Sequence, residues 1–328
     1  MTRLLPALLV LFLAVAASLV AGARALPLVE YARAFAAYDL ANPAHITLMQ
    51  IRIPRLLGGL VAGAALGIAG TVMQTITRNP LADPGILGIN AGAAFTLLLG
   101  GLLLGQPDAA TVTLLALPGA ALASALVFML GGGMRGDAGP VRLTLAGAAL
   151  NAMLLSLVSA IVLLRQESLD VFRFWVAGSL AEAGARPILF MALLAAGGGL
   201  VALAAAPRIE ALLLGEALSR GLGTRPGWVQ AAALVAVTLT TSAAVGVAGP
   251  IAFLGLIVPP IARRFAGSSL RMQLLVSALL GAALLLMADA LGRVVIPPSE
   301  VRAGIMTALI GAPVFIWLAR RVRSGAFG

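Results

Sequence analysis

The chain has 328 residues, of which 61% are hydrophobic and 10% are charged, and its mean hydropathy is +1.07. A soluble chain carries about a quarter charged residues, so most of this surface must face lipid rather than water. The absence of cysteine and the single histidine, His45, exclude disulfides, thiolate metal sites and paired-histidine metal motifs, and we expect no metal site.

All 22 basic residues are arginine. A P-loop needs a lysine to reach the β- and γ-phosphates of its nucleotide, so this chain cannot supply a standard P-loop ATPase site. The formal net charge of +10 would suit nucleic acid, but the arginines lie in short loops between apolar runs. Membrane lipid headgroups and partner proteins are therefore the expected counterparts, and nucleic acid is not.

Apolar runs long enough to cross a membrane follow one another along the chain. About 20 apolar residues cross a hydrocarbon core of roughly 30 Å, and such runs occur at 4–24, 54–76, 86–105, 111–132, 141–164, 186–206, 228–248, 271–292 and 304–320. A tenth run, 251–265, contains Pro259 and Pro260, which predict a short or broken helix. The expected fold is an all-α integral membrane protein with about ten transmembrane helices in one domain, 1–328.

Arginine placement indicates the orientation of the chain. With ten crossings and the amino terminus inside, 13 arginines fall on the cytoplasmic side and 9 outside, which puts both termini in the cytoplasm. The first run has a cleaved signal peptide as its alternative, but it exceeds the ~7–15 apolar residues usual for a signal.

The spans carry no ionisable residue at their centres. Asp289 lies nearest, close to the outer end of its run. Ion-coupled carriers usually keep such residues near the midplane, so an ion-coupled secondary transporter stays open only through the short run at 251–265.

Two segments at the predicted inner side have a distinct pattern. In the loop 77–85, Asn79-Pro80 predicts a non-helical turn, Asp83 can cap the next helix, and Pro84 suits its first position. In the loop 207–227, apolar residues recur at helical spacing between glycines, which predicts two short helices on the bilayer surface. Trp175, Trp228 and Trp317 lie near span ends and are interpreted as interfacial anchors.

Several motifs carry a family resemblance. The run Arg52-Ile53-Pro54-Arg55, the block TRNPLADPG at 77–85 and the block LGINAG at 87–92 closely resemble the permease family of binding-protein-dependent ABC importers for iron–siderophores, haem and vitamin B12. Four further stretches agree with that family: 141–148, 172–180, 249–264 and 288–313. Many relatives have histidine where this chain has Pro260, so a role resting on that histidine does not transfer.

The resemblance implies a transport subunit without catalytic residues or cofactors. It implies the type II ABC importer permease fold in the bacterial inner membrane. The expected partners are cytoplasmic ATP-binding subunits that bind ATP and magnesium, a periplasmic substrate-binding protein, and a second permease that is either an identical copy or a paralogue. The segments 88–92 and 172–180 look most like siderophore permeases, especially those for catecholates, with haem and vitamin B12 as alternative cargoes.

The resemblance also implies three groups of site residues. Arg52, Arg55 and Arg293 match arginines that receive glutamates of the binding protein through bidentate pairs. The cytoplasmic gate corresponds to Asn79, Leu81, Pro140 and Val141. The contact that couples the permease to the ATPase, within 207–227, corresponds to Leu214, Gly215, Glu216 and Ala217. The echo of GIAG at 67–70 in GVAG at 246–249 suggests duplicated halves at about 54–164 and 228–320.

Overall fold

The computed structural model describes residues 4–22, 25–105, 108–133, 140–221 and 223–323. Within these ranges every regular element is a helix. Ten helices correspond to the ten predicted runs: α1 (Leu5–Val20), α4 (Ile53–Ile76), α5 (Ile89–Leu104), α6 (Ala109–Leu130), α7 (Pro140–Leu164), α9 (Ile188–Leu213), α11 (Pro226–Ala248), α12 (Leu254–Ala266), α13 (Leu270–Val295) and α14 (Ala303–Arg323).

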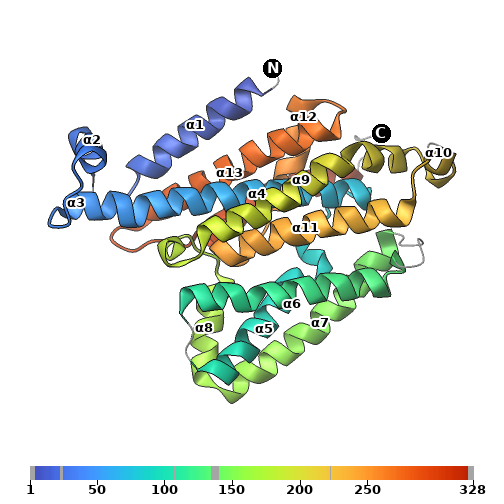
Figure 1. Ribbon diagram of the computed structural model, residues 1–328, viewed down its shortest axis with the longest axis horizontal. Coiled ribbons are helices and arrows are strands. Elements are labelled where there is room, and N and C mark those ends of the chain that lie inside the picture. The colour runs from blue at the N-terminus through green and yellow to red at the C-terminus, as the bar shows by residue number, and fades with distance from the viewer. Residues whose placement is uncertain (1–3, 23–24, 106–107, 134–139, 222, 324–328) are drawn as a thin grey trace.

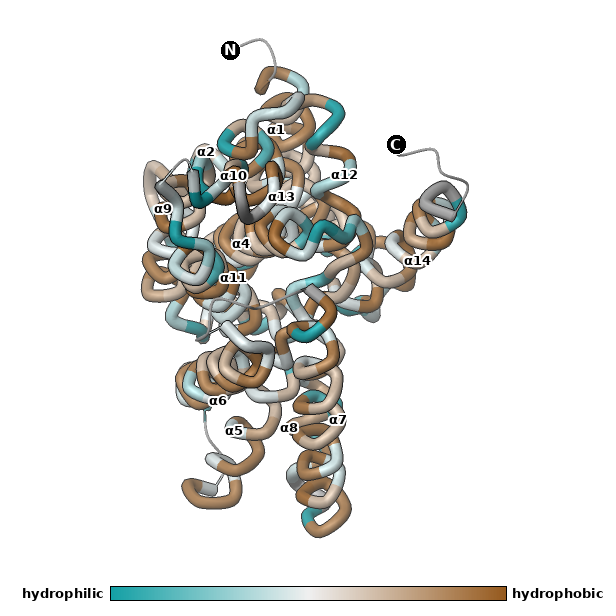
Figure 2. Tube along the Cα trace, turned by 90° about the vertical axis from the view of Figure 1, so that its right-hand side faces the viewer, coloured by the Kyte–Doolittle hydropathy of each residue, from teal (hydrophilic) through white to brown (hydrophobic). Residues whose placement is uncertain are grey.

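The lengths of these helices suit a multi-pass membrane protein. In the described part of the chain, seven helical segments are long and apolar enough to cross a membrane, and α1 and α5 are apolar helices of 16 residues each. Figure 2 shows apolar residues along most of the bundle, with α14 projecting from its side, where it packs against α12 and α13.

Short helices cover the two ends of the bundle (Figure 1). We call one end the α3 end, because it carries α2 (Leu28–Ala36), α3 (Pro43–Ile46), the π-helical turn η1 (Thr47–Arg52), α8 (Gln166–Val176) and the 3-10 turn η4 (Ala183–Ala185). The opposite, α10 end carries α10 (Glu216–Gly221) and the 3-10 turn η2 (Pro84–Leu87).

Glycines of α4 allow the centre of the bundle to pack closely. A methyl group at Gly67 would lie 2.1 Å from the carbonyl oxygen of Ser277 in α13, and one at Gly70 would lie 1.9 Å from that of Gly255 in α12. The hydroxyl of Thr71 is 2.7 Å from that of Ser277. Small residues thus bring α4 into backbone contact with two neighbours, as expected for helix packing in lipid.

Helix α12 is short, as predicted, and continues through Pro259 and Pro260. A proline leaves the carbonyl four residues earlier without its helical donor, which here frees the carbonyls of Gly255 and Leu256. The side-chain amide of Gln74 donates to both, at 3.5 and 3.0 Å. A polar side chain of α4 therefore satisfies the break in α12.

The segment 207–227 differs from the prediction of two surface helices. Helix α9 runs on to Leu213, so residues 207–213 belong to the spanning helix and only α10 is separate. The extension continues the buried face of α9 to Ile209, and the carboxylate of Glu210 accepts a hydrogen bond from the backbone N–H of Leu270 at the start of α13. These contacts offset the cost of Pro207 inside the helix.

Trp175 also differs from its prediction. Its side chain is buried in the core, whereas Trp228 and Trp317 are exposed, as interfacial anchors require. The indole of Trp175 packs where α8 meets the bundle because the chain turns back there into the loop before η4.

Candidate functional site

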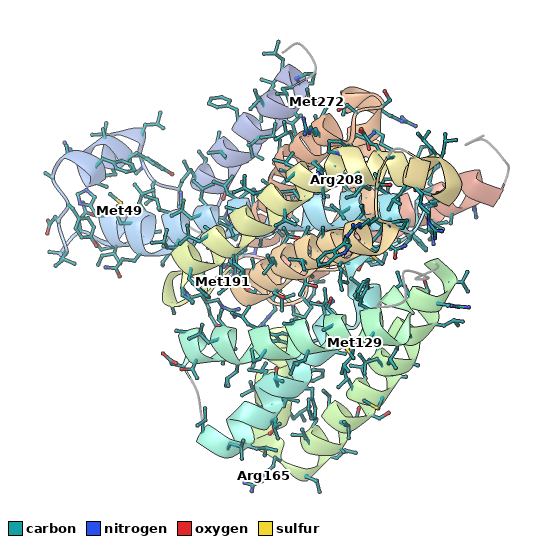
Figure 3. All side chains as sticks on the ribbon, turned by 45° about the vertical axis from the view of Figure 1, so that its right-hand side comes forward. Met49, Met129, Arg165, Met191, Arg208 and Met272 are labelled. Atoms are coloured by element: carbon teal, nitrogen blue, oxygen red, sulfur yellow. The ribbon has the colours of Figure 1, made fainter. Side chains whose placement is uncertain are left out.

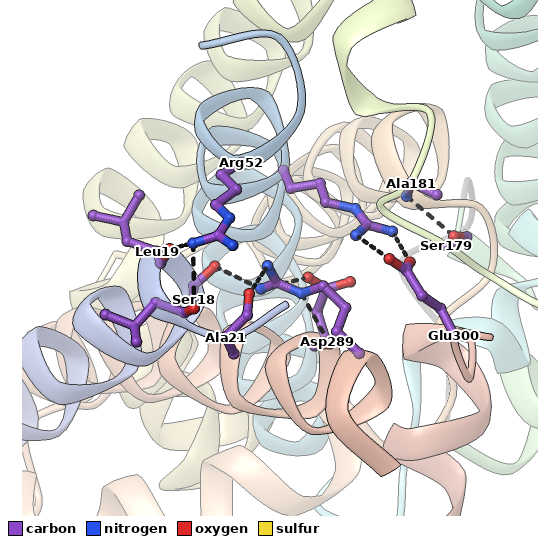
Figure 4. Close-up of polar contacts among 11 residues, drawn as sticks. Ser18, Leu19, Ala21, Arg52, Ser179, Ala181, Asp289 and Glu300 are labelled. Carbon is purple, nitrogen blue, oxygen red and sulfur yellow. Dashed lines mark hydrogen bonds and ion pairs between the residues drawn. The ribbon is translucent and has the colours of Figure 1, made fainter. Parts of the chain in front are cut away.

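Three arginines lie together at the α3 end, where α1, α4 and α13 meet (Figure 4). Arg52 ends η1, and its guanidinium donates to the carbonyl oxygen of Val20 at 3.2 Å and to the hydroxyl of Tyr31 at 2.7 Å. It also donates to the carbonyl oxygen of Leu19. The end of α1 thus uses the guanidinium to satisfy carbonyls that have no helical partner.

Arg55 forms a two-pronged ion pair with Glu300. Its Nη1 lies 3.1 Å from Oε1 of Glu300, and its Nη2 bonds Oε2. Glu300 belongs to the loop between α13 and α14, and its side chain is 40% exposed. The Arg55 guanidinium holds the pKa of the Glu300 carboxyl below its usual value. This geometry matches the fork of an arginine to the two oxygens of a carboxylate.

Arg293 joins α13 to α1. Its guanidinium lies 3.1 Å from the carboxylate of Asp289 one turn earlier, and it donates to the carbonyl oxygen of Ala21 at 2.7 Å and to the hydroxyl of Ser18 at 3.2 Å. Asp289 is therefore paired within the bundle and is not a free intramembrane charge.

The three predicted docking arginines thus lie close together, but each already forms hydrogen bonds within the chain. Arg52, Arg55 and Arg293 are 3%, 5% and 3% exposed, and each has partners within the chain. A protein arriving at this end meets the carboxylate of Glu300 before it meets the guanidinium of Arg55. The docking role of the three arginines stays a prediction.

A cavity of about 760 Å³ opens beside these arginines. Its charged lining includes Arg55, Arg186 and Arg302, together with Asp170, Glu182 and Glu300. The three carboxylate side chains are substantially exposed, at 55%, 68% and 40%, whereas those of Arg55 and Arg186 are buried. The charges that are accessible on the wall are therefore mainly carboxylates, and the half-buried Arg302 is the cation nearest the surface.

An aromatic side chain at the cavity lies between two arginines. The guanidinium carbons of Arg173 and Arg302 lie 4.8 and 4.6 Å from the ring centroid of Phe174. Arg302 also donates to the carbonyl oxygen of Phe174. Cation–π contacts of this kind hold α8 against the start of α14.

At the α10 end, the turn 77–85 has the predicted geometry. The side-chain oxygen of Asn79 accepts from the backbone N–H of Leu81 at 2.9 Å, and that of Asp83 accepts from Gly85 at 2.8 Å. Pro84 opens η2, as predicted. Leu81 packs against the cluster formed by α12 and α14. Asn79 thus shapes the turn, and Leu81 connects it to two spanning helices.

A second bond joins this turn to the end of α9. Arg78 adopts a positive φ of 49° and its guanidinium donates to the carbonyl oxygen of Leu212 at 2.6 Å. Leu212 lies in the predicted coupling loop 207–227, two residues before the predicted coupling residue Leu214. The predicted gate turn and coupling segment are therefore in direct contact, which the sequence motifs did not indicate.

The remaining predicted residues lie at the same end. Val141 is 71% exposed at the start of α7, which packs against η2. Leu214 is 60% exposed, and Gly215 has a positive φ of 101° immediately before α10. The side chains of Pro140, Glu216 and Ala217 lie outside the described part of the chain, although the backbones of all three are helical.

Sequence reasoning did not find the partners of the arginines or of the proline break. Glu300 lies 245 residues from Arg55, and Gln74 lies 181 residues from Gly255. One sequence feature could have indicated the role of Gln74: it is a glutamine in a run, 56–76, that otherwise consists of apolar and small residues.

Comparison with known proteins gives matches along almost the whole chain. The profile of the FecCD transport family matches residues 8–321. The ferric enterobactin transport system permease protein FepD of Escherichia coli (strain K12) is 43% identical over 320 residues, which are 97% of this chain and 95% of that protein. The probable siderophore transport system permease protein YfiZ of Bacillus subtilis (strain 168) is 38% identical, over 95% and 93% of the two chains.

Among solved structures, a metal-chelate type ABC transporter in an inward-facing conformation aligns with a TM-score of 0.82. Its sequence is 27% identical, and the alignment covers 98% of this chain and 99% of that one. The helices described above therefore have the arrangement found in a permease of that transporter class.

Proposed function

Because the chain belongs to the FecCD transport family, we propose that it is the transmembrane permease of an ATP-driven importer that moves a ferric siderophore from the periplasm to the cytoplasm. The observation that carries the proposal is the 43% identity to a ferric enterobactin permease over nearly the full length of both chains. The fold and the resemblance read from the sequence motifs are confirmed by the family match and by the solved transporter.

In this proposal the α3 end faces the periplasm of a bacterial inner membrane, and both termini face the cytoplasm. A periplasmic binding protein delivers the cargo beside the cavity of about 760 Å³. The charges exposed on its wall are mainly carboxylates, and the guanidiniums of Arg55 and Arg186 lie buried behind them. Arg52, Arg55 and Arg293 receive carboxylates of the binding protein after their internal partners move.

The α10 end carries the connection to the energy source. The chain has no lysine and so no standard P-loop, and in this proposal a separate pair of ATPase subunits binds ATP and magnesium. They contact Leu214 to Ala217, and the Arg78–Leu212 hydrogen bond passes their movement to the gate turn and to Leu81. Rigid helices then transmit closure of the ATPases across the membrane.

Uptake of labelled cargo tests this function. Cells with and without the gene are supplied with ferric catecholate siderophore, ferric hydroxamate siderophore, haem or cobalamin. If cells without the gene lose uptake of one ferric siderophore only, the result supports the proposal and identifies the cargo. If only haem or cobalamin uptake is lost, the chain is still an importer permease, but the assignment of a siderophore as its cargo is wrong.

The energy source of uptake distinguishes an ATP-driven importer from an ion-coupled secondary transporter. In proteoliposomes that contain the permease and the ATPase subunits, uptake should require hydrolysable ATP on the side of the membrane where the ATPase subunits are bound. Uptake by the permease alone, driven by a proton or sodium gradient, would contradict the proposal.

A further inference from the structure

A second cavity lies away from the transport site, on the flank formed by α9 and α11. Its volume is about 450 Å³, and it lies at the α10 end of these helices. Arg208, Arg225 and Trp228 form its polar rim, while Val201, Ala204 and Val229 belong to its apolar floor. Figure 3 shows Arg208 on α9.

The two guanidiniums at the rim have no polar partner among the described residues. Arg208 and Arg225 are exposed, and neither side chain has a hydrogen bond or ion pair with a described residue. The other arginines considered above have protein partners, such as Glu300 for Arg55 and Leu212 for Arg78. Two unpaired cations at one rim indicate a site for an anion.

The position of the rim indicates which anion. On α9, exposed residues recur along one face from Leu189 through Leu193 and Leu200 to Ala204, and Arg208 follows four residues later. That spacing keeps all of them on one side of the helix. On α11, Trp228 is 73% exposed, and Val235, two turns on, is 47% exposed. The exposed apolar faces of α9 and α11 thus both end at the level of Arg208 and Trp228, where charged or interfacial residues begin.

This level is the depth of lipid headgroups. Arginines and tryptophans gather where the hydrocarbon core meets water, and basic pockets between transmembrane helices bind anionic headgroups. The start of α11 at Pro226 adds the positive end of a helix dipole beside Arg225. Below the rim, small side chains leave a groove between α9 and α11.

We propose that this groove binds one anionic glycerophospholipid, with its phosphodiester on Arg208 and Arg225 and an acyl chain along the floor of Val201, Ala204 and Val229. The lipid comes from the leaflet at the α10 end. The site is separate from the cavity beside Arg55, because the two cavities share no lining residue and lie at opposite ends of the bundle. Its occupation fixes α9 against α11, and α9 carries Leu212 and the coupling segment.

Native mass spectrometry of the full chain in a mild detergent tests the site. Dioleoyl-phosphatidylglycerol and dioleoyl-phosphatidylcholine share their acyl chains, so their first binding events report the headgroup. We expect the anionic lipid to bind about tenfold more tightly, and the double variant R208Q/R225Q to lose this preference. R208K/R225K should retain most of it.

The matched control is Arg271→Gln, which removes an exposed arginine at the same end of the bundle but outside the groove. This variant should keep the preference for the anionic lipid. An equal loss in Arg271→Gln would show a general effect of net charge and overturn the site. Equal affinity of the unmodified chain for both lipids would overturn it as well.

Two further outcomes identify other occupants and would also overturn the proposal. Displacement of the lipid by inorganic phosphate alone, at millimolar concentration, would show a site for a free anion. Unchanged lipid affinity in R208Q/R225Q, with loss of copurified ATPase subunits, would assign the two arginines to a protein interface. None of these measurements uses the transported cargo, so failure of the siderophore test leaves them interpretable.

Discussion

The Arg55–Glu300 pair joins a buried guanidinium to a loop at the α3 end. Replacing Glu300 by glutamine removes the charge but keeps the size of the side chain. The variant leaves Arg55 with a weaker acceptor in a buried position, and we expect a loss of about 1–2 kcal/mol in the free energy of unfolding. The thermal midpoint of the detergent-purified chain should fall by several degrees.

The control for this variant is Asp170→Asn. Asp170 and Arg173 form an exposed ion pair one turn apart, with side chains 55% and 60% exposed. Exposed pairs contribute little, so the midpoint should stay within about one degree of the unmodified chain. A larger loss in Asp170→Asn than in Glu300→Gln would contradict the importance of the buried guanidinium.

The same pair predicts a dependence on pH. The pKa of Glu300 is lowered in the folded chain, chiefly by the hydrogen bond from Arg55. Its contribution is therefore fully present above the ordinary value of 4.5 and is lost as pH falls through the lower folded value. Midpoints measured below pH 4.5 should fall more steeply for the unmodified chain than for Glu300→Gln. Parallel curves would show that Glu300 does not carry this dependence.

Sequence patterns identified residues whose role is local and missed those whose role depends on distant contacts. Asn79, Asp83 and Pro84 act within a few residues of themselves, so turn chemistry predicted them correctly. The burial of Arg52 depends on the end of α1 and on Tyr31, which the sequence places far away. No local rule predicts such a pairing.

At the scale of elements, the close contact of α4 with α13 depends on glycine. A methyl group at Gly67 would lie 2.1 Å from the carbonyl oxygen of Ser277, which is backbone and cannot rotate away. We expect Gly67→Ala to separate the two helices and to destabilise the fold by about 2 kcal/mol or more. Thermal unfolding and the yield of monodisperse protein measure the effect.

Gly197 of α9 supplies the matched comparison. A methyl group there would have no heavy atom within 4 Å. Alanine in an open helical position should stabilise the chain slightly, by about 0.5–1 kcal/mol. Equal behaviour of Gly67→Ala and Gly197→Ala would show that the interhelical contact does not limit packing.

The bond between Arg78 and Leu212 predicts a loss of coupling rather than of assembly. Arg78→Ala removes the donor that joins the gate turn to the end of α9. We expect uptake per ATP hydrolysed to fall about fivefold or more in proteoliposomes, while the ATPase subunits stay bound. Arg78→Lys retains a cationic donor and should recover part of the coupling. Unchanged coupling in Arg78→Ala would exclude this route.

Element boundaries were predictable where hydrophobic length decided them. The long apolar runs gave spanning helices, and the short run at 251–265 gave a short one. The end of α9 was placed too early because Pro207 indicates a break, whereas Glu210 and Ile209 anchor the additional turns through contacts with other elements. The duplication of the two halves stays a prediction.

Across the whole molecule, the helices differ in how much of their apolar surface the chain itself covers. The apolar windows of the helical segment Pro43–Ile76, which contains α4, and of α11 are 67% and 72% buried, whereas those of α7 and α14 are each 22% buried. Helix α9 is also poorly covered, at 28%, but its exposed stripe ends in the rim of Arg208 and Trp228. Lipid suits the α9 flank, and a second permease suits the α14 flank.

A photo-crosslinking amino acid distinguishes these two flanks. Placed at Leu309 of α14, which is 63% exposed, it should capture a second permease-sized chain in membranes. Placed at Leu189 of α9, which is 76% exposed, it should capture lipid and no such chain. Mass spectrometry of the captured chain then tells an identical copy from a paralogue. Capture from position 189 and not from 309 would reverse the assignment, because the partner would then cover the flank that carries the proposed lipid groove.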